Sequence, residues 1–247
     1  MRQTLWIAPL LCLLAAAPLR ADEAKDLLDR AIKAQGGEQK LKAAHAVTFK
    51  TKGTIQANGI QVELGGDATA QGAGLVRWNV SFTAMGRTES GVIVVTPEKI
   101  WGKGGNRPTE EAPAEAAFIR DVFRTIRLPQ DLTALRDKDV TLSHLGELKV
   151  DDRTALGLKV AVKGRPDVDL FFDKETALPL RAEIHILEPG DANETTYGFY
   201  FTDYKDVNGV KLFARVALKR DDQVSMEMEF SDFRLQEKFD DTMFAKP

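Results

Sequence analysis

The feature that most constrains the fold is an alternation of apolar and polar residues that recurs along most of the chain. The alternation is clearest at residues 76–82, and it returns at 158–162, 168–172, 180–186 and 224–230. Successive side chains of a β-strand point to opposite faces of a sheet, so each stretch predicts a strand with one apolar face and one polar face. A chain built mainly of such stretches is expected to be mainly β, with antiparallel strands.

Short turns connect the predicted strands. Asn58-Gly59 and Asn208-Gly209 favour two-residue hairpins, because both residue types tolerate positive φ. Strands and turns at this spacing amount to roughly ten to twelve strands, which predicts one large, barrel-like or strongly curved sheet.

Two segments show helical spacing instead. Residues 24–32 place apolar side chains on one face, and we expect Asp22 to begin this helix and Gly36-Gly37 to end it. In the middle of the chain, Thr109 and the two glutamates after it predict the start of a second helix, which Pro129 ends. The apolar stripe of this second helix consists of Phe118, Ile119, Val122, Phe123 and Ile126.

The apolar face of so large a sheet must be covered by curling, by helices or by a ligand. Two helices are too few to cover it fully. The pattern therefore favours a concave apolar surface that stays partly open, which is the geometry of a protein that carries hydrophobic ligands. The alternative is a well-filled barrel without a cavity.

Residues suited to catalysis or metal binding are few. The 247 residues include one cysteine, Cys12, and three widely separated histidines, His45, His144 and His185. No metal-binding spacing, nucleophile elbow or phosphate-binding loop is present in the sequence. The net charge of −3 offers no basic surface for nucleic acid. We therefore predict no catalytic residues, no metal site, no cofactor and no nucleic-acid partner, and we do not expect an enzyme.

Residues 1–21 have the features of a secretory signal. Arg2 precedes an apolar run at residues 5–17, and the small residue Ala21 stands before an acidic segment. The run is shorter than the ~20 residues that a membrane-spanning helix needs, so we expect export and cleavage after Ala21 rather than an integral membrane protein. Cleavage would remove two of the 34 basic residues and none of the 37 acidic ones, which changes the net charge from −3 to −5. Residues 22–247 would then form a single domain.

Several motifs, in this order, resemble the periplasmic outer-membrane lipoprotein carrier superfamily (LolA/LolB-like). The first two are G-L-V-R-W-N-V at residues 74–80 and the tryptophan-containing segment at 92–104. The others are F-F-D-K-E-T-A-L-P-L-R-A at 171–182, the D-Y-K-D-V-N-G-V-K-L-F hairpin at 203–213 and the closing D-D-T-M-F-A-K-P at 240–247. Together they cover nearly all of residues 22–247. The start of the chain is similar to that of uncharacterised exported paralogues in this superfamily.

The resemblance implies an incomplete β-barrel with the N-terminal and mid-chain helices as a lid over an apolar cavity. It also implies a monomer in the periplasm that binds lipid or lipoprotein acyl chains. Combined with the strand pattern, it gives the following expected ligand-binding residues of the cavity or lid: Trp78, Val80, Phe82, Trp101, Phe118, Val122, Phe123 and Phe172.

One position departs from the family pattern. The family's Arg-Pro step before the tryptophan strand would fall near Gln71, Gly72 and Ala73, where neither Arg nor Pro is present. The resemblance therefore supports the fold more firmly than the shuttling of lipoproteins. The alternative function is an envelope sensor or protein-interaction module on the same fold, with an envelope protein as its partner.

Overall fold

One antiparallel sheet organises the chain. The structure is a computed structural model that describes residues 17–57, 59–104 and 109–247. Its strands follow the order β6-β5-β4-β3-β2-β1-β13-β12-β11-β10-β9-β8-β7, a sheet of 13 strands. The pairing of β1 with β13 joins two series of hairpins, and β6 and β7 are the two edges. Because these edges do not pair with each other, the sheet is a curved, incomplete barrel, as predicted.

The first half of the chain contains two helices and then six strands. The helices are α1 (Ala17–Ala34) and α2 (Glu38–Ala43). The strands are β1 (Ala46–Ala57), β2 (Ile60–Gln71), β3 (Leu75–Ala84), β4 (Arg87–Val95), β5 (Ile100–Gly104) and β6 (Thr109–Glu110).

The second half begins with helix α3 (Pro113–Arg127) and two short 3₁₀ helices, η1 (Leu128–Gln130) and η2 (Leu132–Arg136). The remaining elements are β7 (Val140–Val150), β8 (Arg153–Val162), β9 (Val168–Asp173), β10 (Pro179–Leu187), β11 (Glu194–Val207), β12 (Val210–Arg220), β13 (Gln223–Gln236) and the 3₁₀ helix η3 (Asp241–Phe244).

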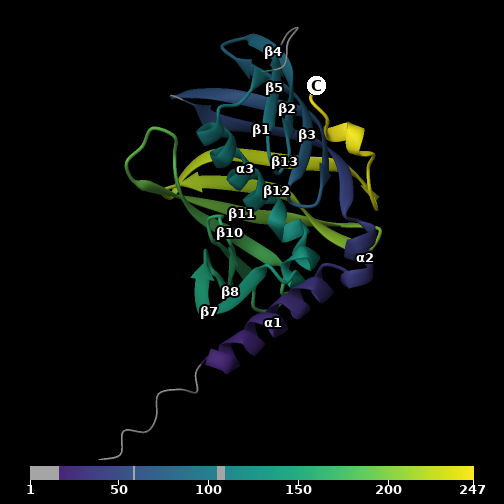
Figure 1. Cartoon of the computed structure of the whole chain (residues 1–247), viewed down its shortest axis with the longest axis vertical. Coiled ribbons are helices and arrows are strands. Elements are labelled where there is room, and N and C mark those ends of the chain that lie inside the picture. The colour runs from purple at the N-terminus through teal and green to yellow at the C-terminus, as the bar shows by residue number, and fades with distance from the viewer. Residues whose placement is uncertain (1–16, 58, 105–108) are drawn as a thin grey trace, which may run out of the picture.

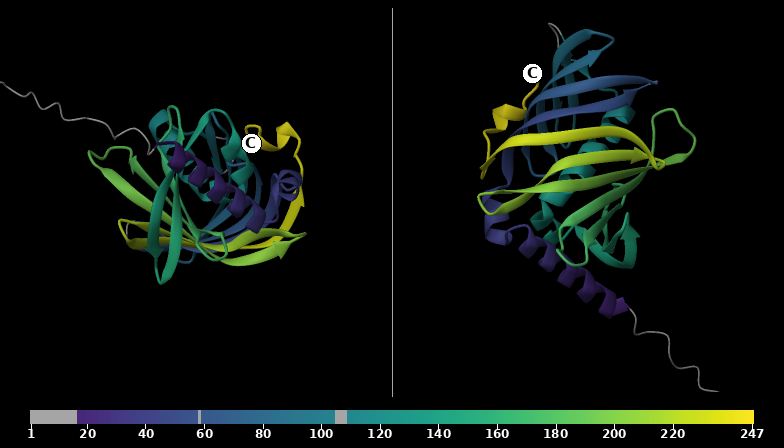
Figure 2. Two further views of the ribbon diagram at one scale, coloured as in Figure 1. Left: turned by 90° about the horizontal axis from the view of Figure 1, so that it is seen from below. Right: turned by 180° about the vertical axis from the view of Figure 1, so that it is seen from behind.

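The helices lie on the concave side of the sheet. Figure 1 shows α3 crossing this side at the level of β12 and β13, and Figure 2 shows α1 across the open side of the trough that the strands form. Leu27 and Leu28 of α1 are almost fully buried and share one apolar core with strand residues such as Phe172 and Phe199. The predicted arrangement of an N-terminal helix and a mid-chain helix over a curved sheet is confirmed.

The starts of two helices differ from the sequence-based expectation. Helix α1 already includes Ala17, so Asp22 lies inside the helix and does not begin it. Helix α3 begins at Pro113, and Thr109–Glu110 is the short strand β6. Proline at the first helical position has a suitable φ and lacks only an N–H that would have no partner, and it keeps the residue before it extended. The predicted signal segment lies largely in residues 1–16, outside the described residues.

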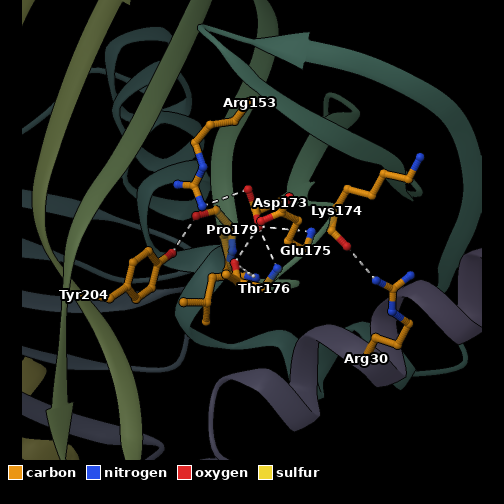
Figure 3. Close-up of polar contacts among 9 residues, drawn as sticks. Arg30, Arg153, Asp173, Lys174, Glu175, Thr176, Pro179 and Tyr204 are labelled. Atoms are coloured by element: carbon orange, nitrogen blue, oxygen red, sulfur yellow. Dashed lines mark hydrogen bonds and ion pairs between the residues drawn. The ribbon is translucent and has the colours of Figure 1, made fainter.

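A buried aspartate fixes the turn between β9 and β10, and this turn also contacts α1 (Figure 3). The Asp173 carboxylate accepts hydrogen bonds from the backbone N–H of Thr176 at 2.6 Å and from its hydroxyl at 2.8 Å. In the same turn, the carbonyl oxygen of Lys174 accepts a hydrogen bond from the Arg30 guanidinium of α1 at 3.0 Å. Burial alone would raise the pKa of Asp173, but the hydrogen bonds from Thr176 hold it below its usual value.

Candidate functional site: an apolar cavity beneath helix α3

A cavity of about 560 Å³ lies between α3 and the concave face of the sheet. Its volume falls in the range typical of small-molecule pockets. The wall is almost entirely apolar, and it combines residues from both series of hairpins with one face of α3. The apolar lining residues are Phe49, Ile55, Leu64, Ala68, Val76, Trp78, Phe82, Phe118, Val122, Phe123, Ile126, Tyr197, Phe213, Val216, Leu218, Met226, Met228, Phe230 and Phe233.

Small residues on β2 help to leave this space open. The strand register places Ala68 opposite Trp78 of β3 and Gly66 opposite Val80. Because cross-strand partners share a face of the sheet, Trp78 and Val80 of β3 have neighbours of minimal volume on β2, whereas Phe82 faces Leu64. The two strands therefore form part of the concave wall, and the indole of Trp78 faces the cavity.

A short chain of hydrogen bonds fixes Trp78. Its indole Nε1–H donates to the Thr51 hydroxyl at 2.9 Å, and that hydroxyl donates to the carbonyl oxygen of Gly66 at 3.2 Å. The polar edge of the indole is thus satisfied within an apolar wall, where an unpaired N–H would be costly. The apolar part of the ring remains as cavity lining.

The charged residues of the wall lie at two places. Glu188 accepts a hydrogen bond from the Tyr197 hydroxyl and another from the Arg220 guanidinium, both at 2.6 Å. Burial, and then the contact with Glu188, raises the pKa of Tyr197 above its ordinary value. Arg127 and Gln130 line the wall elsewhere, at the C-terminal end of α3.

Comparisons with known proteins find similarity in fold. No protein-family model matches the chain, and no curated protein matches its sequence. A LolA superfamily protein from Nitrosomonas europaea superposes with a TM-score of 0.59 at 13% identity, covering 90% of this chain and 97% of the other. A DUF1329 family protein from Desulfovibrio piger gives 0.58 at 14% identity, with 90% and 97% coverage. A domain from Vibrio parahaemolyticus, named for outer membrane lipoprotein sorting, gives 0.59 at 12% identity, with 91% and 97% coverage.

The chain has a LolA-like fold. Within it, contacts of Asp131 join the segment that follows α3 to the residues where the Arg-Pro step of the family would fall. The Asp131 carboxylate, beyond the end of α3, accepts a hydrogen bond from the backbone N–H of Ala73 at 3.1 Å and lies 3.4 Å from Nδ1 of His45. Gly72 has a φ of +56°, and a Cβ at this position would lie 2.9 Å from the His45 ring. The segment after β2 is thus held to the end of α3 without an arginine, and the contact of the His45 imidazole with the Asp131 carboxylate raises the pKa of His45.

Five of the eight predicted ligand-binding residues line the cavity of this LolA-like fold, namely Trp78, Phe82, Phe118, Val122 and Phe123. The other three lie elsewhere. Val80 is buried, with 2% of its surface exposed, but is not part of the cavity wall. Phe172 is fully buried in the core that includes α1. Trp101 packs on the opposite face of the sheet, in a small cluster with Phe239 and Phe244, because Ile100 takes the inward position of β5.

Sequence reasoning missed part of the wall. Met226, Met228 and Phe230 of β13 follow a visible alternation, but nothing in that pattern separates a cavity wall from a filled core. Phe233 also lines the cavity, because a bulge opposite Phe49 at Asp232, where φ is +53°, returns the next side chain to the inner face. Methionine side chains are flexible, so this part of the wall can change shape.

Neither a membrane-spanning helix nor a metal-binding group emerges from the described parts of the chain. Among residues 17–57, 59–104 and 109–247, no helix is both long and apolar enough to cross a bilayer. Within the same ranges, no three His, Cys, Asp or Glu residues are grouped to hold a metal ion.

Proposed function

We propose that this protein binds a lipid or lipoprotein acyl chain in the cavity beneath α3 and carries it through the periplasm. The observation that carries the proposal is the open, apolar cavity of about 560 Å³. Transfer of an acyl chain from water into such a cavity is favourable by about 0.8 kcal/mol per methylene group. Binding of this kind needs no covalent chemistry and no cofactor.

The open cavity also favours a carrier over the alternative, an envelope sensor or interaction module. A module of that kind has no need for unfilled apolar volume in its centre. Here α3 covers the concave face without filling it, since Phe118, Val122 and Ile126 contact the core and also border the cavity.

Export is part of the same proposal. The signal-like segment at residues 1–21 supports cleavage after Ala21 and delivery to the periplasm. The intact mass of the protein recovered from the periplasm should correspond to a chain that begins at Asp22. A mass that includes residues 1–21 would contradict cleavage at this site.

A chain-length series tests acyl binding directly. Decanol, dodecanol and tetradecanol are uncharged and differ only in length, and a change in the Trp78 emission, measured in a Trp101→Phe background, reports their entry into the cavity. We expect the affinity to rise about fourfold per added methylene until the cavity is full, and then to level off. An affinity that does not depend on chain length, or no binding of any of the three alcohols, would contradict the proposal.

A further inference from the structure

Arg127, the last residue of α3, is a buried cation in the wall of an otherwise apolar cavity. Only 8% of its surface is exposed. Its Nη1 donates to the side-chain oxygen of Gln130, which is a neutral partner. Its Nε is buried and has no hydrogen-bond partner within the described part of the chain.

The carboxylate nearest in sequence is already engaged. Asp131 accepts from the backbone of Ala73 and contacts His45, and no ion pair joins Arg127 to a carboxylate among the described residues. Burial lowers the pKa of Arg127 to about 10, so the side chain is still charged near neutral pH. The charge of Asp131 acts on Arg127 through space and offsets part of the cost of burying it, and an anion bound directly beside Arg127 would offset the rest.

The other charged groups of the wall are paired with each other. Glu188 and Arg220 form an ion pair with 2.6 Å between their atoms. They lie near Tyr197, whose ring packs on Phe118 with 5.6 Å between centroids, toward the start of α3. Arg127 is nine residues further along the helix, a rise of about 13 Å. The cavity is thus electrically asymmetric, because its wall carries at the C-terminal end of α3 a positive charge that forms no ion pair among the described residues.

We infer that Arg127 is the subsite for the anionic headgroup of the bound amphiphile, a carboxylate or a phosphate, an assignment that rests on the proposed acyl-binding function. The guanidinium group can donate two parallel hydrogen bonds to either anion. From this subsite the acyl chain runs along Ile126 and Val122 toward Phe118. The ligand is accordingly an anionic single-chain amphiphile rather than a neutral one.

The test compares three probes that share one acyl length: dodecanoate, dodecyl phosphate and dodecanol. Binding of each is measured to the wild-type protein and to Arg127→Met, which keeps an unbranched apolar side chain but removes the charged guanidinium group. The matched control is Arg124→Met, because Arg124 lies on the same helix, is also 8% exposed and is not part of the cavity wall. Near-UV circular dichroism checks that both variants are folded.

We expect Arg127→Met to weaken binding of at least one anionic probe by about tenfold or more, and to weaken dodecanol binding far less or to strengthen it, because the wall becomes more apolar. The anion that loses more affinity identifies the headgroup. Arg124→Met should bind all three probes as the wild type does.

Three results would overturn the assignment. These are equal affinity of the wild type for dodecanol and both anions, equal losses for all three probes in Arg127→Met, and the same losses in Arg124→Met. In each case retained binding of dodecanol would leave the acyl-binding function standing. Failure of the wild type to bind any of the three probes would contradict that function itself.

Discussion

Ala68→Phe should separate ligand binding from folding, because it adds a ring to the cavity and removes nothing. The Ala68 side chain is 4% exposed and lines the cavity, opposite Phe49 on β1 and Trp78 on β3. The new ring would therefore point into the empty volume between two aromatic neighbours.

The size of the effect follows from the volume of the cavity. A cavity of about 150 Å³ accommodates a benzene molecule, so the added ring takes up about a quarter of the 560 Å³. At about 30 Å³ for a group the size of a water molecule, this space corresponds to about five methylene groups. Their transfer is worth about 4 kcal/mol at ~0.8 kcal/mol each, which is an upper bound because the chain can shift. We expect dodecanol binding to weaken by about ten- to a hundredfold.

The assay combines dodecanol titration with thermal unfolding. Filling the cavity should leave the melting temperature unchanged or raise it, since new apolar contacts form. The control is Ala217→Phe on β12, where alternation directs the side chain to the face opposite Val216 and Leu218, two residues of the cavity wall. The control should bind dodecanol normally. Wild-type affinity in a folded Ala68→Phe variant would show that the ligand does not occupy this cavity.

Three further substitutions test the polar contacts that shape the site. Thr51→Val leaves the indole N–H of Trp78 without its acceptor, and should lower the free energy of unfolding in urea by about 1–3 kcal/mol. Asp131 raises the pKa of His45. Their contact therefore stabilises the fold fully below the unfolded-state pKa of about 6.5, and this stabilisation is lost as the pH rises through the pKa of the folded state. His45→Gln should remove this pH dependence from the free energy of unfolding in urea, measured across that range. The pKa of Asp173 is lowered in the folded protein, so its ionised carboxylate stabilises the fold at neutral pH and this stabilisation is lost as the pH falls through the pKa of the folded state. Asp173→Ala should lower the free energy of unfolding by about 1–3 kcal/mol at neutral pH and by less in acid.

Each of these expectations has an outcome that contradicts it. An unchanged urea midpoint for Thr51→Val would mean that the indole finds another acceptor. A pH dependence that persists in His45→Gln would assign the effect to a different group. A cost of Asp173→Ala that is the same in acid as at neutral pH would show that the ionised carboxylate is not what stabilises the turn.

The curved sheet could be predicted from the sequence because apolar and polar residues alternate along most of its strands. Strand β7 could not be predicted in this way, because His144 and Gly146 occupy inward positions of that strand while Leu145 points outward. The binary pattern that marks a half-buried strand is therefore absent over its centre. Instead of an apolar contact, the inward-facing His144 makes a polar one, with its Nδ1 3.3 Å from the carboxylate of Glu23 on α1.

The cavity is less accessible to sequence reasoning than the sheet. Alternation placed Trp78 and Phe82 correctly on the inner face, but Trp101 lies on the outer face because the hairpin between β4 and β5 gives the inner position to Ile100. Phe213 lies out of phase with Val216 and Leu218 and still lines the cavity. Its partner strand β11 also changes phase, at Asp203, where φ is +55°. Such local irregularities are set by packing between strands and leave no signal in a single sequence.

Native mass spectrometry of the protein gently isolated from the periplasm tests the central claim most directly. An acyl-chain carrier with an apolar cavity of about 560 Å³ should retain lipid through isolation. We therefore predict a species heavier than the polypeptide by the mass of one amphiphile, released by organic extraction and reduced in Ala68→Phe. A spectrum that contains only the mass of the polypeptide, in protein that also fails to take up added dodecanol, would contradict the account.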